Sequence, residues 1–488
     1  MTNITIRNLT STPLTLQLVE RYHSPEHLLL HRHNHANGTS KSSSWNLTSI
    51  FNGTSAATSP SHEAIASNAE NFTTSTPDLR IEPFKAVETD LKQPGTAPGE
   101  KVRLTFECNG DRYRIDIPSS QNESQILIPL SPQPKHEFTA VYLPQHTFLS
   151  IHSSAQLNCW MNNMQDATPL SALSIPGTHN SPTHYKALPS VRCQAISPRQ
   201  QLDNGVRFFD IRVQPESESS GKLILVHAVF PISLTGQKTF ADLLTKVYAF
   251  LDDNQSETLI MSVKREGVGN MSDQQVTRIL HDHYTTHPDH AKYWYTTPGV
   301  PLLGAVRGKI VLMRRLAIND TLRSQNNGAG WALDAECWAD NTSNDLHGDV
   351  CVQDFYEVVS SSNLEKKVGY CKDHLARAGE CVASLPGITC DAVHPVPPQP
   401  FFLNFLSASN FFKMDCWPER VAKFVNPRML EWLCREFAPD GAVGDGGTGI
   451  VVLDWIGAGG DFDLVRCIVG MNSRLMAREM SLVGEKSM

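Results

Sequence analysis

The chain has 488 residues, too many for one core of ordinary size, so we expect two domains. Hydrophobic residues make up 40% of it and charged residues 19%, with a formal net charge of -8. This balance is typical of a globular protein. It argues against nucleic acid as a partner, since no basic cluster would neutralise phosphates, and no stretch is apolar for long enough to span a bilayer.

The first residues and the cysteines indicate the compartment. Residues 1–10 alternate apolar and polar side chains, a strand pattern without the basic start and apolar run of a signal peptide. The eleven cysteines are scattered, form no CxxC pair and match no common zinc spacing. We therefore expect reduced thiols and a cytoplasmic protein that makes peripheral contact with membranes.

The first 155 residues predict a small all-β, sandwich-like domain. Short alternating segments with turn residues between them are typical of strands, and they lie at 4–18, 102–108, 112–117, 125–130 and 136–142. Residues 34–80 are rich in Ser, Thr and Asn and have few large apolar side chains. Such a segment buries too little surface to offset its ordering entropy, so we expect a disordered insertion there.

Residues 156–488 predict an α/β domain. Eight short apolar runs occur in order, at 173–176, 206–213, 223–227, 258–264, 309–314, 349–354, 401–407 and 449–456. Amphipathic helical segments follow at 239–253, 272–284, 363–378, 426–437 and 463–480. Alternating buried strands and helices favour a parallel sheet, and eight such units favour a (β/α)8 TIM-type barrel. The link 214–222 is too short for a helix, so we expect an irregular or partly open barrel.

Most of these runs end in an ionisable side chain. In chain order, the strand ends provide His179, Asp210, Arg212, His227, Lys264, Arg315, Asp354 and Asp454. The active sites of such barrels lie at the carboxyl ends of the strands. The pattern therefore predicts that these side chains meet on one rim.

Two histidines, an arginine and a carboxylate on one rim suit phosphodiester cleavage by an internal hydroxyl. One imidazole can remove a proton from the attacking hydroxyl, and the other can protonate the leaving oxygen. A guanidinium donates to phosphate oxygens and offsets charge that develops there. A carboxylate behind a histidine fixes its tautomer and raises its basicity.

The segment LSIPGTHNS at 173–181 resembles the opening motif of the phosphatidylinositol-specific phospholipases C, X-domain family. Seven further segments agree in order: GVRFFDIR (205–212), LVH (225–227), SETLIMSVKRE (256–266), GKIVLMRR (308–315), VQDFY (352–356), LNFLS (403–407) and IVVLDWI (450–456). One motif is only moderately specific, but eight in order on the predicted strands are strong. The resemblance covers about residues 170 to 480 and is greatest to the bacterial-type, metal-independent branch.

The resemblance implies a role for each strand-end residue. His179 would be the general base for the inositol 2-hydroxyl, with Asp454 behind it, and His227 the general acid for the diacylglycerol oxygen. Arg212 would neutralise the phosphate, and Asp210 would hold the cluster in place. The residues that would bind the inositol headgroup are Asn180, Lys264, Arg315, Asp354 and Tyr356. The products would be diacylglycerol and a cyclic inositol phosphate, formed from a phosphatidylinositol-type lipid at a membrane surface.

No cofactor and no metal ion is expected. The eukaryotic signalling branch of the family holds Ca²⁺ with acidic side chains at places where this chain has Arg212 and Lys264, and two cations would repel the ion. One departure from the bacterial-type pattern is Asn180, where an aspartate is usual. Because Asn carries no charge to support Arg212 or His227, we expect a weaker general acid.

Two other functions are consistent with the strand-end residues. One is a related barrel phosphodiesterase with another phosphodiester substrate, although such enzymes need metal-binding carboxylates near the first histidine. The other is a non-catalytic binding protein in which the barrel is a relic. Arg212 and Lys264 could then be structural ion-pair partners, and Trp338 could serve packing as well as substrate contact.

Overall fold

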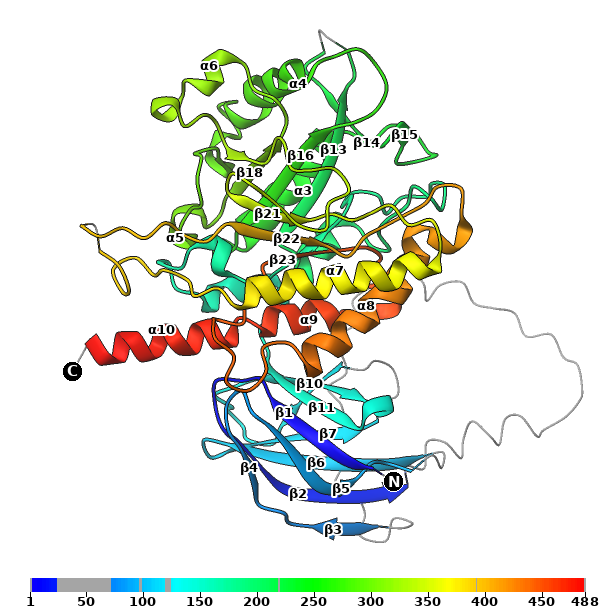
Figure 1. Ribbon diagram of the computed structural model, residues 1–488, viewed down its shortest axis with the longest axis vertical. Coiled ribbons are helices and arrows are strands. Elements are labelled where there is room, and N and C mark those ends of the chain that lie inside the picture. The colour runs from blue at the N-terminus through cyan, green and yellow to red at the C-terminus, as the bar shows by residue number, and fades with distance from the viewer. Residues whose placement is uncertain are drawn as a thin grey trace, which may run out of the picture. The chain divides into compact units, whose positions relative to one another are not determined.

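The computed structural model describes residues 2–23, 72–95, 99–118, 124–217, 220–391 and 393–486 (Figure 1). The chain divides into two compact units: unit 1 contains Met1–Asn8 and Thr12–Ile151, and unit 2 contains Leu9–Ser11 and His152–Met488. Of the predicted insertion at 34–80, residues 34–71 lie outside the described residues. Residues 72–80 contain β3 (Thr73–Ser75) and the start of β4 (Leu79–Ile81), both of which pair with β2. The ladder bonds of β2 order this polar segment.

Unit 1 contains two sheets. The first has the order β5-β1-β11-β10-β8, and the second has the order β3-β2-β6-β7-β9 with β4 beside β2. The other strands are β1 (Asn3–Asn8), β2 (Leu14–His23), β5 (Ala86–Lys92), β6 (Glu100–Cys108), β7 (Asp111–Ile117), β8 (Ser124–Ile126), β9 (Ile128–Pro129), β10 (Phe138–Leu143) and β11 (Phe148–Ser153). Buried side chains of both sheets, such as Ile6, Phe106 and Phe138, share one core. The predicted single strand at 4–18 is two strands, β1 and β2, with a turn at 9–13.

Unit 2 is built on one large, mostly parallel sheet. Its order is β17-β18-β16-β13-β12-β23-β22-β21-β20, with β14 beside β13 and β19 beside β18. The strands are β12 (Ile175–Thr178), β13 (Phe208–Pro215), β14 (Leu223–His227), β15 (Phe230–Pro231), β16 (Leu259–Arg265), β17 (Trp294–Tyr295), β18 (Ile310–Arg315), β19 (Leu333–Asp334), β20 (Asp345–His347), β21 (Val350–Gln353), β22 (Phe401–Phe405) and β23 (Ile450–Leu453). Each of the eight predicted segments overlaps one of these strands, and the fold is α/β.

The third predicted strand differs from a regular parallel unit. β14 pairs with β13 in the antiparallel direction, with Val213 opposite Leu225. The link between the two strands is too short for the crossover that a parallel pair needs, so the chain can only turn back on itself. The hairpin nevertheless returns His227 to the sheet, as the last residue of β14.

Helices cover the sheet of unit 2. They are α2 (Pro198–Asp203), α3 (Phe240–Asp253), α4 (Asp273–Leu280), α5 (Leu303–Val306), α6 (Asp320–Arg323), α7 (Ser361–Gly379), α8 (Pro418–Arg435), α9 (Asp463–Gly470) and α10 (Ser473–Lys486). α3 shows why they form: Thr239 caps its first turn by accepting from the Asp242 amide, and Phe240, Leu244 and Val247 are buried on one face. No described helix is long and apolar enough to cross a membrane.

Candidate active site

The charged strand ends of unit 2 lie at one edge of the sheet. In the strand register, Arg212 of β13 is opposite Lys264 of β16, and Lys264 is opposite Arg315 of β18. On the other side, His179 directly follows β12, and its amide donates to the carbonyl of Leu453 in β23. Because parallel strands end at the same edge, the three cations and this histidine share one rim.

His179 and Asp454 form a buried pair. The Nδ1 atom of His179 lies 3.0 Å from Oδ1 of Asp454, and the two side chains are 15% and 2% exposed. When Nδ1–H donates to this carboxylate, the Nε2 atom becomes the acceptor of the ring. Burial opposes charge on the ring, but the Asp454 carboxylate outweighs it and raises the pKa of His179 well above its usual value. The pair therefore suits a residue that takes up a proton at Nε2.

The second imidazole faces the first. The ring centroids of His179 and His227 are 6.0 Å apart, with the ring planes at 89°. Nδ1 of His227 donates to the carbonyl of Val191 at 2.8 Å, which leaves Nε2 for another partner. Burial opposes charge on this ring too, but the neighbouring Cys193 outweighs it and the pKa of His227 is raised. The two imidazoles thus lie edge to face and close to each other.

Arg212 is held between two carboxylates. Its Nε and one terminal nitrogen donate to Asp210 at 2.9 to 3.2 Å, and its other terminal nitrogen donates to Glu266. Burial would raise the pKa of Glu266, yet Arg212 holds it at about 2, and Arg212 likewise keeps the pKa of Asp210 well below its usual range. A guanidinium has about five N–H donors. Donors therefore remain for a ligand after the two carboxylates have fixed its plane.

Arg315 and Lys264 add two cations beside Arg212. The guanidinium of Arg315 stacks on the ring of Trp338 at 3.8 Å, and one of its nitrogens lies 3.6 Å from Asp210. That buried nitrogen has no hydrogen-bond partner among the described residues. Burial, with Arg212 adjacent, lowers the pKa of Arg315 to about 10, and burial with both arginines lowers the pKa of Lys264. An anion would relieve this repulsion.

The remaining predicted residues differ in their placement. Asp354 directly follows β21 and is buried, and burial raises the pKa of its carboxyl group. The hydroxyl of Tyr356 instead donates to Asp340 at 3.1 Å, and no described hydrogen bond links it to the histidines or to Arg212. Tyr356 is thus the predicted site residue with the weakest connection to the cluster.

Comparison with known proteins shows which family this site resembles. Residues 167–316 match the model described as phosphatidylinositol-specific phospholipase C, X domain. Over these residues the chain is similar to that family. The X domain contains both histidines, Arg212 and Arg315, whereas Asp454 lies beyond the matched residues.

Curated relatives agree with this family. The 1-phosphatidylinositol phosphodiesterase of Listeria monocytogenes is 32% identical over 176 residues, which are 33% of this chain and 50% of that protein. The protein of the same name from Staphylococcus aureus strain Newman is 29% identical over 254 residues, 47% of this chain and 74% of that protein. This chain therefore spans half the length of the first relative and about three quarters of the second. Their shared name is that of a phosphoric diester-cleaving enzyme.

A solved structure shows the same fold as the X domain and its surroundings. A double mutant of the phosphatidylinositol-specific phospholipase C from S. aureus covers 65% of this chain and 98% of its own, with a TM-score of 0.51 and 23% identity. A single mutant of the same protein gives the same TM-score and covers 97% of its own chain. The likeness supports the α/β assignment.

Asn180 of the X domain contacts the first histidine. Its Nδ2 atom lies 3.1 Å from Nε2 of His179, and its backbone amide donates to Asp210 at 3.2 Å. No described hydrogen bond joins its side chain to Arg212 or to His227. Its Oδ1 atom is buried without a described partner. The carboxamide thus touches the nitrogen that would accept a proton.

Replacing Asn180 with aspartate tests whether a charge at this position helps. We expect Asn180→Asp to raise kcat/KM on phosphatidylinositol by roughly threefold to tenfold, since a carboxylate beside Nε2 would stabilise the imidazolium that His179 forms as it takes up the proton. Initial rates across pH would measure this effect, and Asn180→Ala would separate charge from the loss of the amide. A rate that is unchanged or lower in Asn180→Asp would refute the expectation.

Two residues of the site were absent from the sequence-based set. Glu266 binds Arg212 and accepts from the amide of Ala228 at 2.8 Å. It lies two residues after Lys264, so the two-residue period of a strand could have placed it on the same face. Cys193 is fully buried, and its Sγ atom lies 3.8 Å from Nδ1 of His227. It lies in the loop after β12, where no periodicity indicates position.

The ligating atoms of His179, Cys193 and Asp454 lie within 4.8 Å of one another and could hold a metal ion. One nitrogen, one sulfur and one carboxylate do not fit Ca²⁺, which takes about six to eight oxygen ligands. A softer ion would compete with the proton for the His179 ring. This set therefore lacks the oxygen ligands of a calcium site.

Sharp turns follow three of the site residues. Asn180, Ala228 and Trp455 come directly after His179, His227 and Asp454, and their φ angles are 41°, 49° and 58°. Positive φ is unfavourable for alanine and tryptophan, and such conformations concentrate at functional sites. Here the turn lets the chain leave the sheet directly after the residue that points into the rim.

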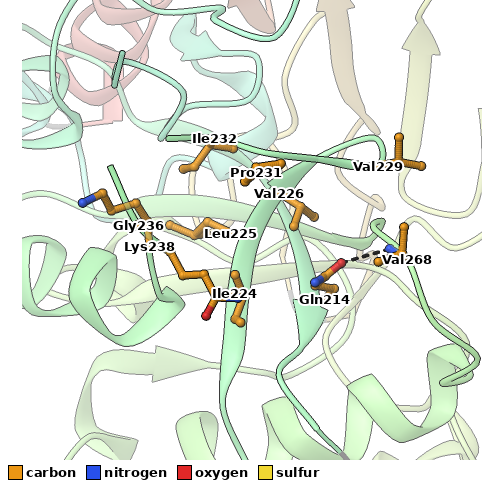
Figure 2. Close-up of a pocket in the computed structure, with 11 residues that line it drawn as sticks. Gln214, Ile224, Leu225, Val226, Val229, Pro231, Ile232, Gly236, Lys238 and Val268 are labelled. Carbon is orange, nitrogen blue, oxygen red and sulfur yellow. Dashed lines mark hydrogen bonds between the residues drawn. The ribbon is translucent and has the colours of Figure 1, made fainter. Parts of the chain in front are cut away.

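A separate pocket lies along the β13–β14–β15 hairpins of the X domain (Figure 2). It has a volume of about 230 Å³, and residues such as Ile224, Val226, Pro231 and Val268 line it. None of the predicted site residues is among its lining residues, and Lys238 is its one charged group. The pocket therefore lacks the acid, base and anion-binding groups that the strand-end cluster contains.

Proposed function

We propose that this protein cleaves phosphatidylinositol-type lipids to diacylglycerol and an inositol cyclic phosphate. The observation that carries the proposal is the pair of imidazoles, 6.0 Å apart and at right angles, beside the fixed guanidinium of Arg212. The family match and the phosphodiesterase relatives support the substrate class. An activity assay should also include a glycerophosphodiester and a sphingolipid, because a related barrel phosphodiesterase would cleave another phosphodiester substrate instead.

The proposed reaction uses both rings. Nε2 of His179 removes the proton of the inositol 2-hydroxyl, and that oxygen forms a bond to phosphorus. The bond from phosphorus to the diacylglycerol oxygen breaks, and the leaving oxygen takes a proton from His227. Asp454, at 3.0 Å, stabilises the His179 imidazolium that has formed. The proton lost by the sugar and the proton gained by the glycerol balance.

The cations of the rim would stabilise the phosphorane-like transition state. Arg212 keeps its plane through Asp210 and Glu266, so its remaining donors need no reorganisation when charge develops. Arg315 has a buried nitrogen without a described hydrogen-bond partner, and Lys264 lies opposite both arginines in the register. These three side chains would provide the positive charge that Ca²⁺ supplies in other members of the family.

Chelation tests the proposed metal independence. We expect the rate of phosphatidylinositol turnover in excess EDTA to be within roughly twofold of the rate in Ca²⁺. The reason is that side chains, and not a metal ion, would neutralise the phosphate charge. The assay follows inositol 1,2-cyclic phosphate. Loss of turnover in EDTA that Ca²⁺ restores would contradict the proposal and favour a calcium-dependent enzyme.

Exposed aromatic residues near the rim support action at a lipid surface. The rings of Phe230 and Phe411 stack at 5.1 Å, and Phe412 packs on Phe411 at 5.3 Å. Phe230 lies in β15, three residues after His227, and Phe411 lies in the segment after β22. Phe412 is 91% exposed, and Met414 is 66% exposed. Exposed apolar groups of this size mark interaction surfaces.

Substitution of Phe412 would test this surface. We expect Phe412→Ser to weaken binding to phosphatidylinositol vesicles by about 10-fold, since burying one Phe contributes about 1.5 to 3 kcal/mol. Turnover of a soluble, short-chain substrate should not change. The control is Val443→Ser, in the loop that enters β23 at the opposite edge, where the side chain is 77% exposed. Equal vesicle binding in both variants would rule out this surface.

We further propose the finer assignment of the fold. The sheet of unit 2 would be an irregular (β/α)8 barrel, and unit 1 a small all-β, sandwich-like domain ending near residue 155. The parallel pairing of β12, β13, β16 and β18, and of β21, β22 and β23, supports the barrel. The eleven cysteines form no disulfide, which supports a reducing, cytoplasmic location.

A further inference from the structure

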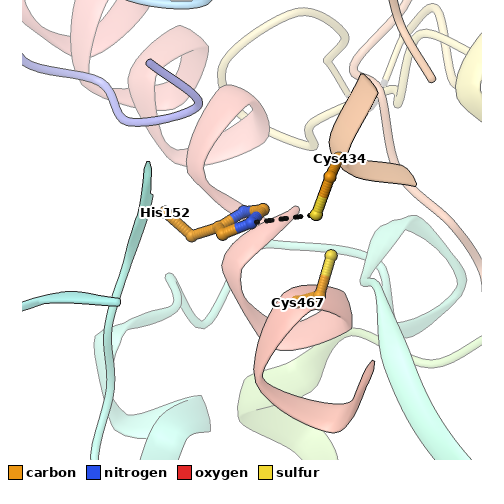
Figure 3. A group of neighbouring side chains, drawn as sticks. All are labelled: His152, Cys434 and Cys467. Atoms are coloured by element: carbon orange, nitrogen blue, oxygen red, sulfur yellow. Dashed lines mark hydrogen bonds between the residues drawn. The ribbon is translucent and has the colours of Figure 1, made fainter. Parts of the chain in front are cut away.

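Unit 2 contains a second group of metal-ligand side chains, outside the rim. It consists of His152, Cys434 and Cys467, here called the Cys2His cluster, and all three residues are buried. His152 is the residue at which unit 2 resumes, near the end of β11, whereas Cys434 lies in α8 and Cys467 in α9. Figure 3 shows the two sulfur atoms and the imidazole pointing toward one another. The proposed reaction uses none of them.

The spacing of the three groups suits a small ion. Sγ of Cys434 lies 3.7 Å from Nε2 of His152, and the ligating atoms of all three residues lie within 4.8 Å of one another. In a tetrahedral zinc site, with Zn–S near 2.3 Å and Zn–N near 2.0 Å, neighbouring ligand atoms are about 3.5 to 3.8 Å apart. The cluster would need to contract by about 1 Å at most, which side-chain rotation can provide.

The backbone is adapted to bring these elements together. α8 and α9 pack against each other, so the two cysteines come from neighbouring helices. At Gly470 of α9, an added Cβ would lie 2.9 Å from Cβ of His152. A glycine at this position therefore lets α9 approach His152 closely. The approach places the imidazole of the strand beside both thiols.

We propose that the Cys2His cluster binds one Zn²⁺ ion. Two thiolates and a neutral imidazole are a preferred zinc donor set, and three protein ligands leave a fourth position for water. On binding, both thiols lose their protons to solvent, so two protons are released for each ion bound and no electron is transferred. If the two cysteines served only in hydrophobic packing, they would not require an imidazole between them.

Zinc content of the full-length protein tests this site. After incubation with Zn²⁺ and gel filtration in reducing buffer, we expect about one zinc per chain, and less than about a tenth of that in Cys434→Ser and Cys467→Ser. Cys416→Ser is the matched control, since Cys416 is also buried and lies just before α8 but belongs to neither group of metal-ligand side chains among the described residues. It should keep the full zinc content.

Two further measurements keep the test independent of variant folding. In the unmodified protein, Co²⁺ in place of Zn²⁺ should give the strong thiolate-to-cobalt absorption of a tetrahedral site, and Zn²⁺ should raise the Tm by about 4 °C. Cys193→Ser should retain the ion. Absence of bound zinc and of the cobalt band in the unmodified protein would overturn the proposal. Loss of zinc in Cys193→Ser alone would also overturn it, because the ion would then lie at the histidines of the rim.

Discussion

Replacing His179 or His227 with alanine is expected to lower kcat/KM on phosphatidylinositol by a factor between about 10² and 10⁴, the usual contribution of one general acid or base. Each ring would be the sole proton carrier on its side of the phosphate. The measurement is the rate of inositol 1,2-cyclic phosphate formation. Activity within threefold of the unmodified protein in either variant would contradict the proposed roles.

The matched control for this prediction is His184→Ala. His184 lies five residues after His179, but burial lowers its pKa to about 4, so the ring stays neutral near pH 7. Its Nδ1 atom contacts the carbonyl of Pro182, away from the pair. We expect turnover in this variant to be unchanged. A loss equal to that in His179→Ala would indicate that the loop, rather than the base, had been disturbed.

The pH profile gives a second readout of the same pair. The base must be deprotonated and the acid protonated, so kcat/KM should be bell-shaped, with values that belong to the coupled pair. Asp454 raises the pKa of His179, so the rising limb should lie above the ordinary histidine range. In Asp454→Asn this limb should move to lower pH while the maximum falls. A purely structural role for Asp454 would lower the maximum and leave the limb in place.

Substitution of Arg212 with lysine is expected to reduce kcat by about 10² to 10³, the loss seen when one donor to a developing oxyanion is removed. A lysine has no fork to span Asp210 and Glu266, so two carboxylates would face the phosphate without a fixed counter-charge. Single-turnover kinetics would show whether the loss is in kcat or in KM.

The control for Arg212 lies on the next strand. Arg265 of β16 pairs with Asp273 and is 37% exposed, so Arg265→Lys should leave kcat unchanged. Thermal unfolding of both variants would separate loss of function from loss of stability. If Arg212→Lys retained kcat within threefold, Arg315 and Lys264 would have to carry the phosphate charge.

The sequence predicted the strands of unit 2 well because they are buried, apolar and short. Strand register then explains why residues as distant as Arg212 and Arg315 share one rim, since both are opposite Lys264. The direction of β14 was not predictable from its composition, which is the same for a parallel or an antiparallel strand. Only the length of the preceding link indicated an irregularity.

The rest of the site depends on contacts that no local pattern encodes. Cys193 reaches His227 from a loop, and Asn180 turned out to contact His179 rather than the arginine. Tyr356 is the last residue of the VQDFY motif, but its hydroxyl donates to Asp340, which lies outside that motif. In each case, tertiary packing decides where a side chain points, whereas the motif fixes only its place along the strand.

Glu266 has a consequence for how the proposed site can change. One of its oxygens holds the guanidinium, and the other accepts from the amide of Ala228, the residue directly after His227. In the proposed reaction, a single carboxyl group would therefore set both the anion site and the position of the proton donor. A mutation at 266 would alter charge stabilisation and proton delivery together.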